Sequence, residues 1–500
     1  AQALFPQLVA ALPAGFEPAQ AAVMGPPCRD DWIPFATTAE LARAIREGAA
    51  TSSRALEIFV ARNASLGKSL NAVVALDLEQ ARARAKAADE AALRKEWWGP
   101  LHGVPMTIKE SHRIAGMNTT EGDPQRVGTL EPESEVLVAR LLAAGAIIWG
   151  KTNVPLHMMD IQSYNDVFGT SCNPWDLAKT PGGSSGGGAA AVAAGITPLE
   201  LGTDVGGSIR IPAAYCGIFG HKSTYNLIPK RVPGRPQKEI AVCGPLARDP
   251  EDLRLALECT AGSDMGSVGT AWRLEMPRPT KSCLAEYRIA VWADDAFCRV
   301  HDDVREVGLA LADALESRGA HVDRSARPSF DLAENLKLYT ALTAADAVLA
   351  AEKDVGVSLL AYQLGKAKQY EIRTAWSRFF QEYDVLICPS HCTPAFPHDH
   401  SERQGRKLQL TVDGKDSSMS YWKALFWAIL TNTALLPSTT FPAGLGLRTG
   451  LPVGLNVVGP EWSDFITIDV ARLLKVELGL GFLSPPAPFG QALASPSSKL

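Results

Sequence analysis

The sequence predicts an α/β protein: a single large domain with a mixed central β-sheet flanked by helices on both faces. Short apolar runs alternate with helical patterns along most of the chain, which is typical of β-α-β units around parallel strands. The alternation continues past the middle without an internal repeat or a long linker, so one domain fits better than several. We expect an N-terminal extension at 1–34, the domain at 35–485 and a C-terminal tail at 486–500.

The elements follow one another in a regular order. Thr37 and Thr38 precede a helical pattern that stops at Gly48, as capping residues at the two ends of a helix would do. The further helices are expected at SSRALEIFVARNASL (52–66), LEQARARAKAADEAALRKE (78–96), PESEVLVARLLAAG (132–145), DDVREVGLALADALESRG (302–319) and DFITIDVARLLKVELG (464–479). The strands are expected at NAVVALD (71–77), GVPMTIKE (103–110), AIIWGKT (146–152), YRIAVW (287–292), AHVDR (320–324), DVLICP (384–389) and LPVGLNVVG (451–459).

Composition excludes some classes of function. The net charge of −5 and the lack of a basic stripe argue against a nucleic-acid partner. The longest apolar stretches fall well short of the roughly 18 residues of a membrane-spanning helix. The nine cysteines include no CxxC pair, which favours free thiols in a reducing compartment. We therefore expect a cytoplasmic protein, or a peroxisomal one if the final Ser-Lys-Leu is native.

Two Gly-rich loops, TPGGSSGGG (180–188) and DVGGSIR (204–210), are the strongest functional signal. Glycine is typical of places where backbone approaches another group closely or takes an unusual conformation. A phosphate-binding loop would need a lysine after the glycines, and none follows. GGSSG formally matches the G-x-S-x-G turn of α/β-hydrolases with Ser184 central, but Pro181 and a polar lead-in do not suit the strand which that turn requires.

Taken together with Lys109, the two loops resemble the amidase signature family of serine hydrolases. The matching segments are GVPMTIKE, GKTNVP, GTSCNPWDLAKTPGGSSGGGAAAVAAG, LGTDVGGSIRIPAAYCGIFGHK, YDVLICP and GLPVGLNVVGP. The resemblance runs from about residue 35 to about residue 485, and several ordered motifs agree. Gly188, Ser223 and His112 depart from the pattern, which commonly has serine, proline and phenylalanine at these positions.

The resemblance implies a catalytic triad of Ser208 as nucleophile, Ser184 as a bridging serine after a cis peptide bond, and Lys109 as base. It implies no metal and no cofactor. The amides of Val205, Gly206, Gly207 and Ser208 are expected to form an oxyanion hole. The residues expected to support the two loops are Gly183, Ser185, Asp204 and Arg210.

The chemistry is consistent with that triad. A serine hydroxyl needs an adjacent base, and a neutral lysine can act as one. Lysine ordinarily has a pKa of about 10.4, so keeping it neutral near pH 7.4 takes about 4 kcal/mol. Burial and neighbouring positive charge can supply this free energy.

The substrate is less well defined by the sequence. His112, Met158, Met159 and Phe168 are expected to line the substrate pocket, with a further contribution from the region between Tyr339 and Gln381. The segment HCTPAFPHDH (391–400) combines cysteine and histidine, but its spacing fits no standard zinc site, so we expect a loop there.

We expect an amidohydrolase that cleaves C–N bonds of small carboxamides, anilides or carbamates through an acyl-enzyme, as a monomer or homodimer. The alternative is an A-type subunit of a tRNA-dependent amidotransferase, which works only with partner subunits. Hydrolysis of a small anilide by the chain alone would separate the two.

Overall fold

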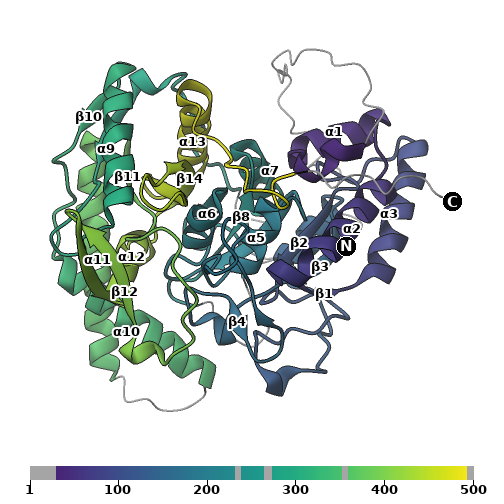
Figure 1. The fold of residues 1–500 in the computed structure, drawn as a ribbon, viewed down its shortest axis with the longest axis horizontal. Helices are drawn as coiled ribbons and strands as arrows, with labels where there is room; N and C mark the ends of the chain where they lie inside the picture. Colours follow the sequence, from purple (N-terminus) through teal and green to yellow (C-terminus); the bar gives the residue numbers. More distant parts are fainter. Residues whose placement is uncertain (1–29, 231–237, 264–272, 352–357, 492–500) are drawn as a thin grey trace.

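The computed structural model describes residues 30–230, 238–263, 273–351 and 358–491. They form one large α/β domain around a mixed eleven-stranded sheet, as the sequence predicts (Figure 1). The strand order is β1-β3-β2-β6-β8-β7-β14-β15-β11-β9-β10. The bounds of these strands are β1 Val73–Leu76, β2 Pro105–Lys109, β3 Ile147–Thr152, β6 Leu199–Asp204, β7 Phe219–Lys222, β8 Val242–Ala247, β9 Arg288–Val291, β10 His321–Asp323, β11 Val385–Pro389, β14 Ser438–Leu445 and β15 Pro452–Val458.

Two parallel groups lie within the sheet and are joined by antiparallel strands. β2 runs parallel to both β3 and β6, and β9 runs parallel to both β10 and β11. The pairs β6–β8, β8–β7, β7–β14, β14–β15 and β15–β11 are antiparallel. Two small ribbons stand apart from this sheet, β4 (Tyr164–Asn165) with β5 (Gly169–Thr170), and β12 (Lys407–Val412) with β13 (Lys415–Ser420).

Helices cover both faces of the sheet, because successive strand residues point in opposite directions. On β11, Ile387 packs in the core cluster that holds α4, α7, α9 and α13, whereas Leu386 and Cys388 pack in the cluster that holds α6, α10, α11 and α12. In Figure 1, α1, α2 and α3 gather at one end of the molecule and α9, α10 and α11 at the other. The helix bounds are α1 Thr38–Glu47, α2 Ser52–Leu70, α3 Leu78–Leu93, α4 Val136–Ala143, α5 Gly186–Ala193, α6 Arg210–Cys216, α7 Pro250–Thr260, α9 Asp302–Ser317, α10 Leu332–Ala351, α11 Leu359–Glu382, α12 Phe426–Thr433 and α13 Asp464–Leu478.

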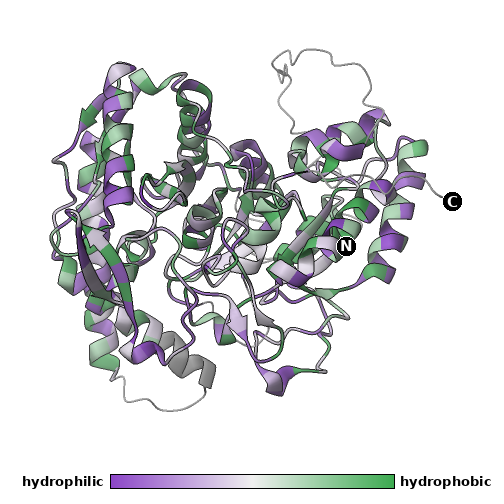
Figure 2. Ribbon diagram, viewed as in Figure 1, coloured by the Kyte–Doolittle hydropathy of each residue, from purple (hydrophilic) through white to green (hydrophobic). Residues whose placement is uncertain are grey.

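Helix amphipathicity differs between the outer and inner helices. In Figure 2 the outer helices carry both hydrophobic and hydrophilic residues, as expected where one face meets the core. By contrast, α5 is buried along its whole length, and its glycine and alanine residues allow close packing between the sheet and α6. This close packing brings the two Gly-rich loops, which precede α5 and α6, into the centre of the molecule.

The packed chain extends beyond the expected domain limits of 35 and 485. Ile33, in the short 3-10 helix Asp30–Phe35, and Phe489 are both buried in one core cluster with α1 and α2. The eight cysteines in the described ranges are free thiols. In the same ranges, no helix combines the length and the apolar character that a membrane crossing requires.

Candidate active site

Lys109 is the last residue of β2 and is completely buried. Its Nζ lies within hydrogen-bonding distance of Ser184 Oγ (2.8 Å), Thr203 Oγ1 (2.8 Å) and the Thr203 carbonyl (3.3 Å). Burial, followed by the positive charge of Lys230, lowers the pKa of Lys109 well below its ordinary value. The site therefore favours a neutral amine, which has a lone pair that can accept a proton.

Ser184 lies in the first Gly-rich loop, immediately after a cis peptide bond to Gly183. A Cβ atom at position 183 would lie 2.5 Å from the backbone nitrogen of Gln162 and 2.7 Å from the carbonyl oxygen of Asp160. Only glycine fits against this neighbouring backbone. The close approach holds the loop so that the Ser184 hydroxyl meets Lys109 in the interior.

Ser208 lies in the second Gly-rich loop and keeps a small exposed fraction of 8%, whereas Ser184 keeps 1%. The backbone N–H of Ser185 donates to the Ser208 carbonyl at 3.1 Å, which ties the two loops together. Among the described residues, Ser208 Oγ has no hydrogen-bond partner. Of the three residues of the expected triad, Ser208 is thus the most accessible.

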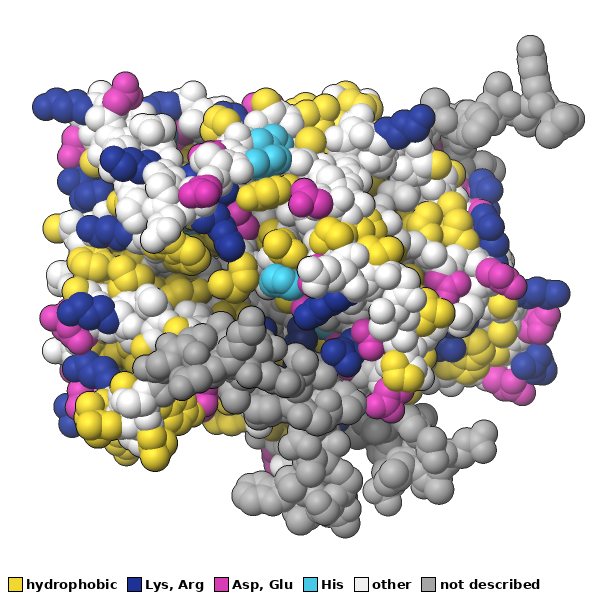
Figure 3. All heavy atoms as spheres, turned by 90° about the horizontal axis from the view of Figure 1, so that it is seen from below, with side chains coloured by type: hydrophobic (Ala, Val, Ile, Leu, Met, Phe, Trp, Pro, Cys, Tyr) yellow, Lys and Arg dark blue, Asp and Glu magenta, His cyan; other side chains and the backbone are white. Residues whose placement is uncertain are grey.

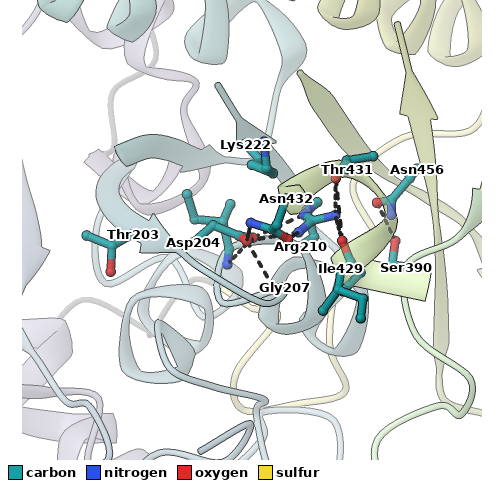
Figure 4. A network of polar contacts seen from close by, with 12 residues as sticks. Thr203, Asp204, Gly207, Arg210, Lys222, Ser390, Ile429, Thr431, Asn432 and Asn456 are labelled. Carbon is teal, nitrogen blue, oxygen red and sulfur yellow. Dashed lines mark hydrogen bonds and ion pairs between the residues drawn. The ribbon is translucent and has the colours of Figure 1, made fainter. Parts of the chain in front are cut away.

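The second loop is organised around the carboxylate of Asp204 (Figure 4). Asp204 Oδ1 accepts from the Gly207 N–H and from Arg210 Nη2, both at 2.9 Å, and from Asn432 Nδ2 at 3.1 Å. Asp204 Oδ2 accepts from the Ile209 N–H at 3.0 Å and from Arg210 Nε at 3.1 Å. Burial alone would raise the pKa of this carboxyl, but the charge and hydrogen bonds of Arg210 hold it well below its usual range.

This arrangement corrects one expectation from the sequence. The Gly207 N–H points to Asp204, so it is already bonded and is not free to bind an oxyanion. Within the described chain, the amides of Val205, Gly206 and Ser208 donate to no protein acceptor. The reason for the difference is that the carboxylate takes the amides of residues 207 and 209, which leaves the amide of residue 208 between them free.

Arg210 connects the loop to α12 and is completely buried. Its Nη1 donates to the Ala428 carbonyl at 2.7 Å and to Thr431 Oγ1 at 2.8 Å, and its Nη2 donates to Asn432 Oδ1. Figure 4 shows Thr431 and Asn432 on one helix facing Asp204 and Arg210. The ion pair between Asp204 and Arg210, with α12 behind it, fixes the position of the loop.

Comparisons with known proteins identify the family of this chain. A family model described as amidase matches residues 54–366 and 356–468. The chain belongs to the amidase signature family. The A-type subunit of the glutamyl-tRNA(Gln) amidotransferase of Anaeromyxobacter sp. (strain K) is 33% identical over 483 residues, covering 88% of this chain and 95% of that protein. The corresponding protein of Deinococcus deserti is 30% identical, covering 92% and 99% of the two chains.

Solved structures give the same family. A structure described simply as an amidase has 26% identity and a TM-score of 0.74, covering 89% of this chain and 100% of that one. A protein whose structure is described as revealing the evolutionary origins of an s-triazine catabolic enzyme has 25% identity and a TM-score of 0.77, covering 90% and 100%.

The four residues expected in the substrate pocket lie in different environments. His112 is completely buried and pairs through Nδ1 with Glu135, which is also buried. Met158 and Phe168 are half-buried, and the side chain of Met159 is 49% exposed. None of the four has a described polar side-chain contact with Lys109, Ser184 or Ser208.

Other residues do meet the second Gly-rich loop. A Cβ atom at Gly206 would lie 2.2 Å from the hydroxyl of Tyr339, and one at Gly207 would lie 2.7 Å from the Ala428 side chain. Tyr339 falls in the region from 339 to 381 that the sequence indicated. Thr203 and Asn432 were not foreseen, although Thr203 stands next to Asp204 in the motif itself.

The segment 391–400 is held by ordinary contacts. His391 pairs with the hydroxyl of Tyr215 at 2.8 Å, His398 lies 3.3 Å from the Leu177 carbonyl, and the ring of His400 stacks on Tyr164. Among the residues with a described position, no group of three or more His, Cys, Asp or Glu side chains is arranged to hold a metal ion.

Proposed function

We propose that the chain cleaves the C–N bond of a carboxylic amide through an acyl-enzyme on Ser208. Ser208 Oγ attacks the carbonyl carbon, its proton passes to Ser184, and the proton of Ser184 passes to neutral Lys109. The lysine ammonium then returns the proton through Ser184 to the departing amine, and water releases the acid. The observation that carries this proposal is the 2.8 Å contact between buried Lys109 and Ser184, in a loop bonded to Ser208.

The free amides of the second loop support the same reaction. The carbonyl oxygen of the substrate becomes negatively charged when Ser208 attacks. We assign the N–H groups of Val205, Gly206 and Ser208 to this oxyanion, because Asp204 leaves them without a protein partner. Each such donor contributes about 3–4 kcal/mol to stabilisation of a transition state.

Two functions are candidates, and they differ in the amide that is cleaved. The curated relatives at 30–33% identity favour an A-type subunit of a glutamyl-tRNA(Gln) amidotransferase over a free-standing hydrolase. A free-standing amidase is favoured by a different observation, the acidic balance of the chain, whose net charge is −5. On the face seen in Figure 3, acidic and basic side chains are interspersed among the coloured residues. These residues form no continuous basic surface of the kind that binds a large RNA.

The test is release of ammonia or amine by the purified chain. Glutamine and a small anilide are offered separately, with and without added B- and C-type amidotransferase subunits, beside Ser208→Ala. Glutamine cleavage that requires the added subunits supports the amidotransferase candidate. Anilide cleavage by the chain alone supports the free-standing amidase. An unchanged rate in folded Ser208→Ala would overturn the proposed mechanism for both.

A further inference from the structure

A buried carboxyl group, Glu200, lies behind the catalytic centre and takes no part in the reaction proposed above. Glu200 is the second residue of β6 and has no exposed surface. In the described chain it forms no ion pair. A buried acid without a charged partner is rare in a core, and it needs a reason.

Glu200 bonds to two threonine hydroxyls from two different strands. Thr107 Oγ1 of β2 donates to one carboxyl oxygen, and Thr152 Oγ1 of β3 donates to the other at 2.7 Å. Both threonines are completely buried. One side chain of β6 therefore bonds both to β2, its neighbour in the sheet, and to β3, the strand beyond β2.

These two hydrogen bonds lie close to Lys109 in the sheet. Thr107 precedes Lys109 by two residues, and Thr152 is the residue paired with Lys109 across the parallel strands β2 and β3. Thr107 is in turn the partner of Glu200 between β2 and β6. The two bonds thus fix the end of β2, from which the Lys109 side chain extends to Ser184.

Gly188 explains how the acid is accommodated. Glu200 points at α5, and a Cβ atom at Gly188 would lie 2.5 Å from Glu200 Cγ and 2.8 Å from its Cδ. Serine, which is common at this position in the family, would overlap with the glutamate. The departure at Gly188 and the buried acid at Glu200 are therefore two parts of one local arrangement.

Glu200 acts as a neutral acid at pH 7. Burial raises its pKa to about 8, against the opposing effects of Thr107, Thr152 and the charge of Lys109. Two other charged groups act on Lys109. Asp204 is paired with Arg210, and the positive charge of Lys230 disfavours a positive charge on Lys109. α5, which covers Glu200, contains only glycine, alanine and valine.

We propose that Glu200 is a positioning residue for the catalytic base, which holds Lys109 against Ser184 through its hydrogen bonds to Thr107 and Thr152. This inference rests on the proposed role of Lys109. A displacement of about 1 Å at a reacting group can cost about 100-fold in rate, so a small shift of β2 would reduce activation of Ser208.

The experiment measures the second-order rate of Ser208 labelling by a fluorophosphonate, which requires no knowledge of the substrate. Glu200→Gln keeps the shape of the neutral acid and can bond to both threonines, so we expect it to label within about threefold of the wild type. Glu200→Met keeps the length without the hydrogen bonds, and we expect at least about a tenfold loss. Thr152→Val removes one of the two hydrogen bonds with little change in shape, and it should also be labelled more slowly. This variant replaces Glu200→Met in the test if Glu200→Met does not fold.

A matched control is Asp252→Leu. Asp252 is another completely buried acid. It accepts from the amides of Thr38 and Ala39 where α7 meets α1, and it has no described contact with the catalytic triad. This variant should lower Tm and leave the labelling rate of the folded protein unchanged. The inference would be overturned if Glu200→Met and Thr152→Val were both labelled at the wild-type rate. It would also be overturned if Glu200→Gln were labelled as slowly as Glu200→Met. Lys109→Ala, run in parallel, tests the base itself: normal labelling there would refute the proposed function instead.

Discussion

The backbone N–H of Ser185 donates to the carbonyl oxygen of Ser208 at 3.1 Å, and this single bond joins the two Gly-rich loops of the protein. Its position matters because Ser184, the neighbour of Ser185, contacts Lys109, while Ser208 itself is the more accessible of the two serines. Three side chains from β2 and the loops before α5 and α6 are thereby held in one place. The predictions below test what each contributes.

Ser208 should be the residue that reacts with electrophiles. A fluorophosphonate is expected to label the peptide that contains Ser208, because this hydroxyl is accessible and lies beside the free amides of the loop. Mass spectrometry of the labelled, digested protein locates the site. Ser184→Ala should slow the labelling without moving it, and a label found on Ser184 in the wild type would favour the α/β-hydrolase alternative.

Replacement of Lys109 should remove most of the activity. General-base contributions amount to about 10²–10⁴-fold, and we expect Lys109→Ala to lose kcat/KM in that range. Lys109→Arg should be nearly as damaging, because guanidinium does not lose its proton at these pH values. In the wild type, kcat/KM should fall as the pH falls, since protonated Lys109 cannot accept a proton.

His221→Ala is the comparison for these lysine variants. His221 is buried and bonded to Thr439 and Asp464, away from the loops, so its loss should affect stability more than kcat/KM. Circular dichroism establishes that each variant is folded. Near-full activity in the folded Lys109 variants would refute the proposed base.

The sequence predicted the scaffold well because the relevant signals are local. The strand at β2 and the helices at α1, α9 and α13 follow from apolar periodicity and capping residues, and each is found within a few residues of its expected bounds. The second helix is longer than expected: α2 continues to Leu70 and ends at Asn71 in a left-handed conformation, because nothing at residue 66 terminates it. Such details depend on what the helix packs against.

The parts that the sequence did not predict arise from contacts between distant segments. The use of the Gly207 amide by Asp204 depends on the path of the whole loop, and the contributions of Asn432 and Tyr339 come from helices far along the chain. The hairpin of β12 and β13 was missed: β12 (KLQLTV) alternates polar and apolar residues, but its partner β13 (KDSSMS) is almost wholly polar and gives no strand signal. His112 was placed in the pocket because of its proximity to Lys109 in sequence, whereas its side chain pairs with Glu135.

Asp204 should be required for the oxyanion loop. Asp204→Asn removes the charge opposite Arg210 and weakens the bonds to the Gly207 and Ile209 amides. Because loss of a single oxyanion donor costs about 10²–10³-fold in kcat, we expect a loss of at least that order when the loop is released. Steady-state kinetics on an amide that the wild type cleaves provide the measurement. Asp464→Asn, at a buried carboxylate outside the loop, should retain kcat, and an equal loss in both variants would contradict a specific role for Asp204.

Burial of Lys109 should also give a pH-dependent cost to stability. The native pKa of Lys109 lies well below its ordinary value, while in the unfolded chain it returns to about 10.4. Between these two pKa values the unfolded chain binds a proton that the native protein does not, so unfolding becomes less favourable as the pH rises. The contribution of this one residue is about 1.4 kcal/mol per pH unit in the free energy of unfolding.

Lys109→Met removes the titrating group and fills a similar volume, so it should remove this slope. We expect the stability of Lys109→Met relative to the wild type to decrease as the pH rises from 7 to 9, because only the wild type gains stability from a buried neutral lysine over this range. Urea unfolding of both proteins at the two pH values measures the difference, in which all other titrating groups cancel to first order. Lys86→Met, at an exposed lysine of α3, is the control and should show no such change. Equal pH dependence in Lys109→Met and the wild type would mean that the buried lysine keeps its proton, and a charged lysine cannot be the base that activates Ser208.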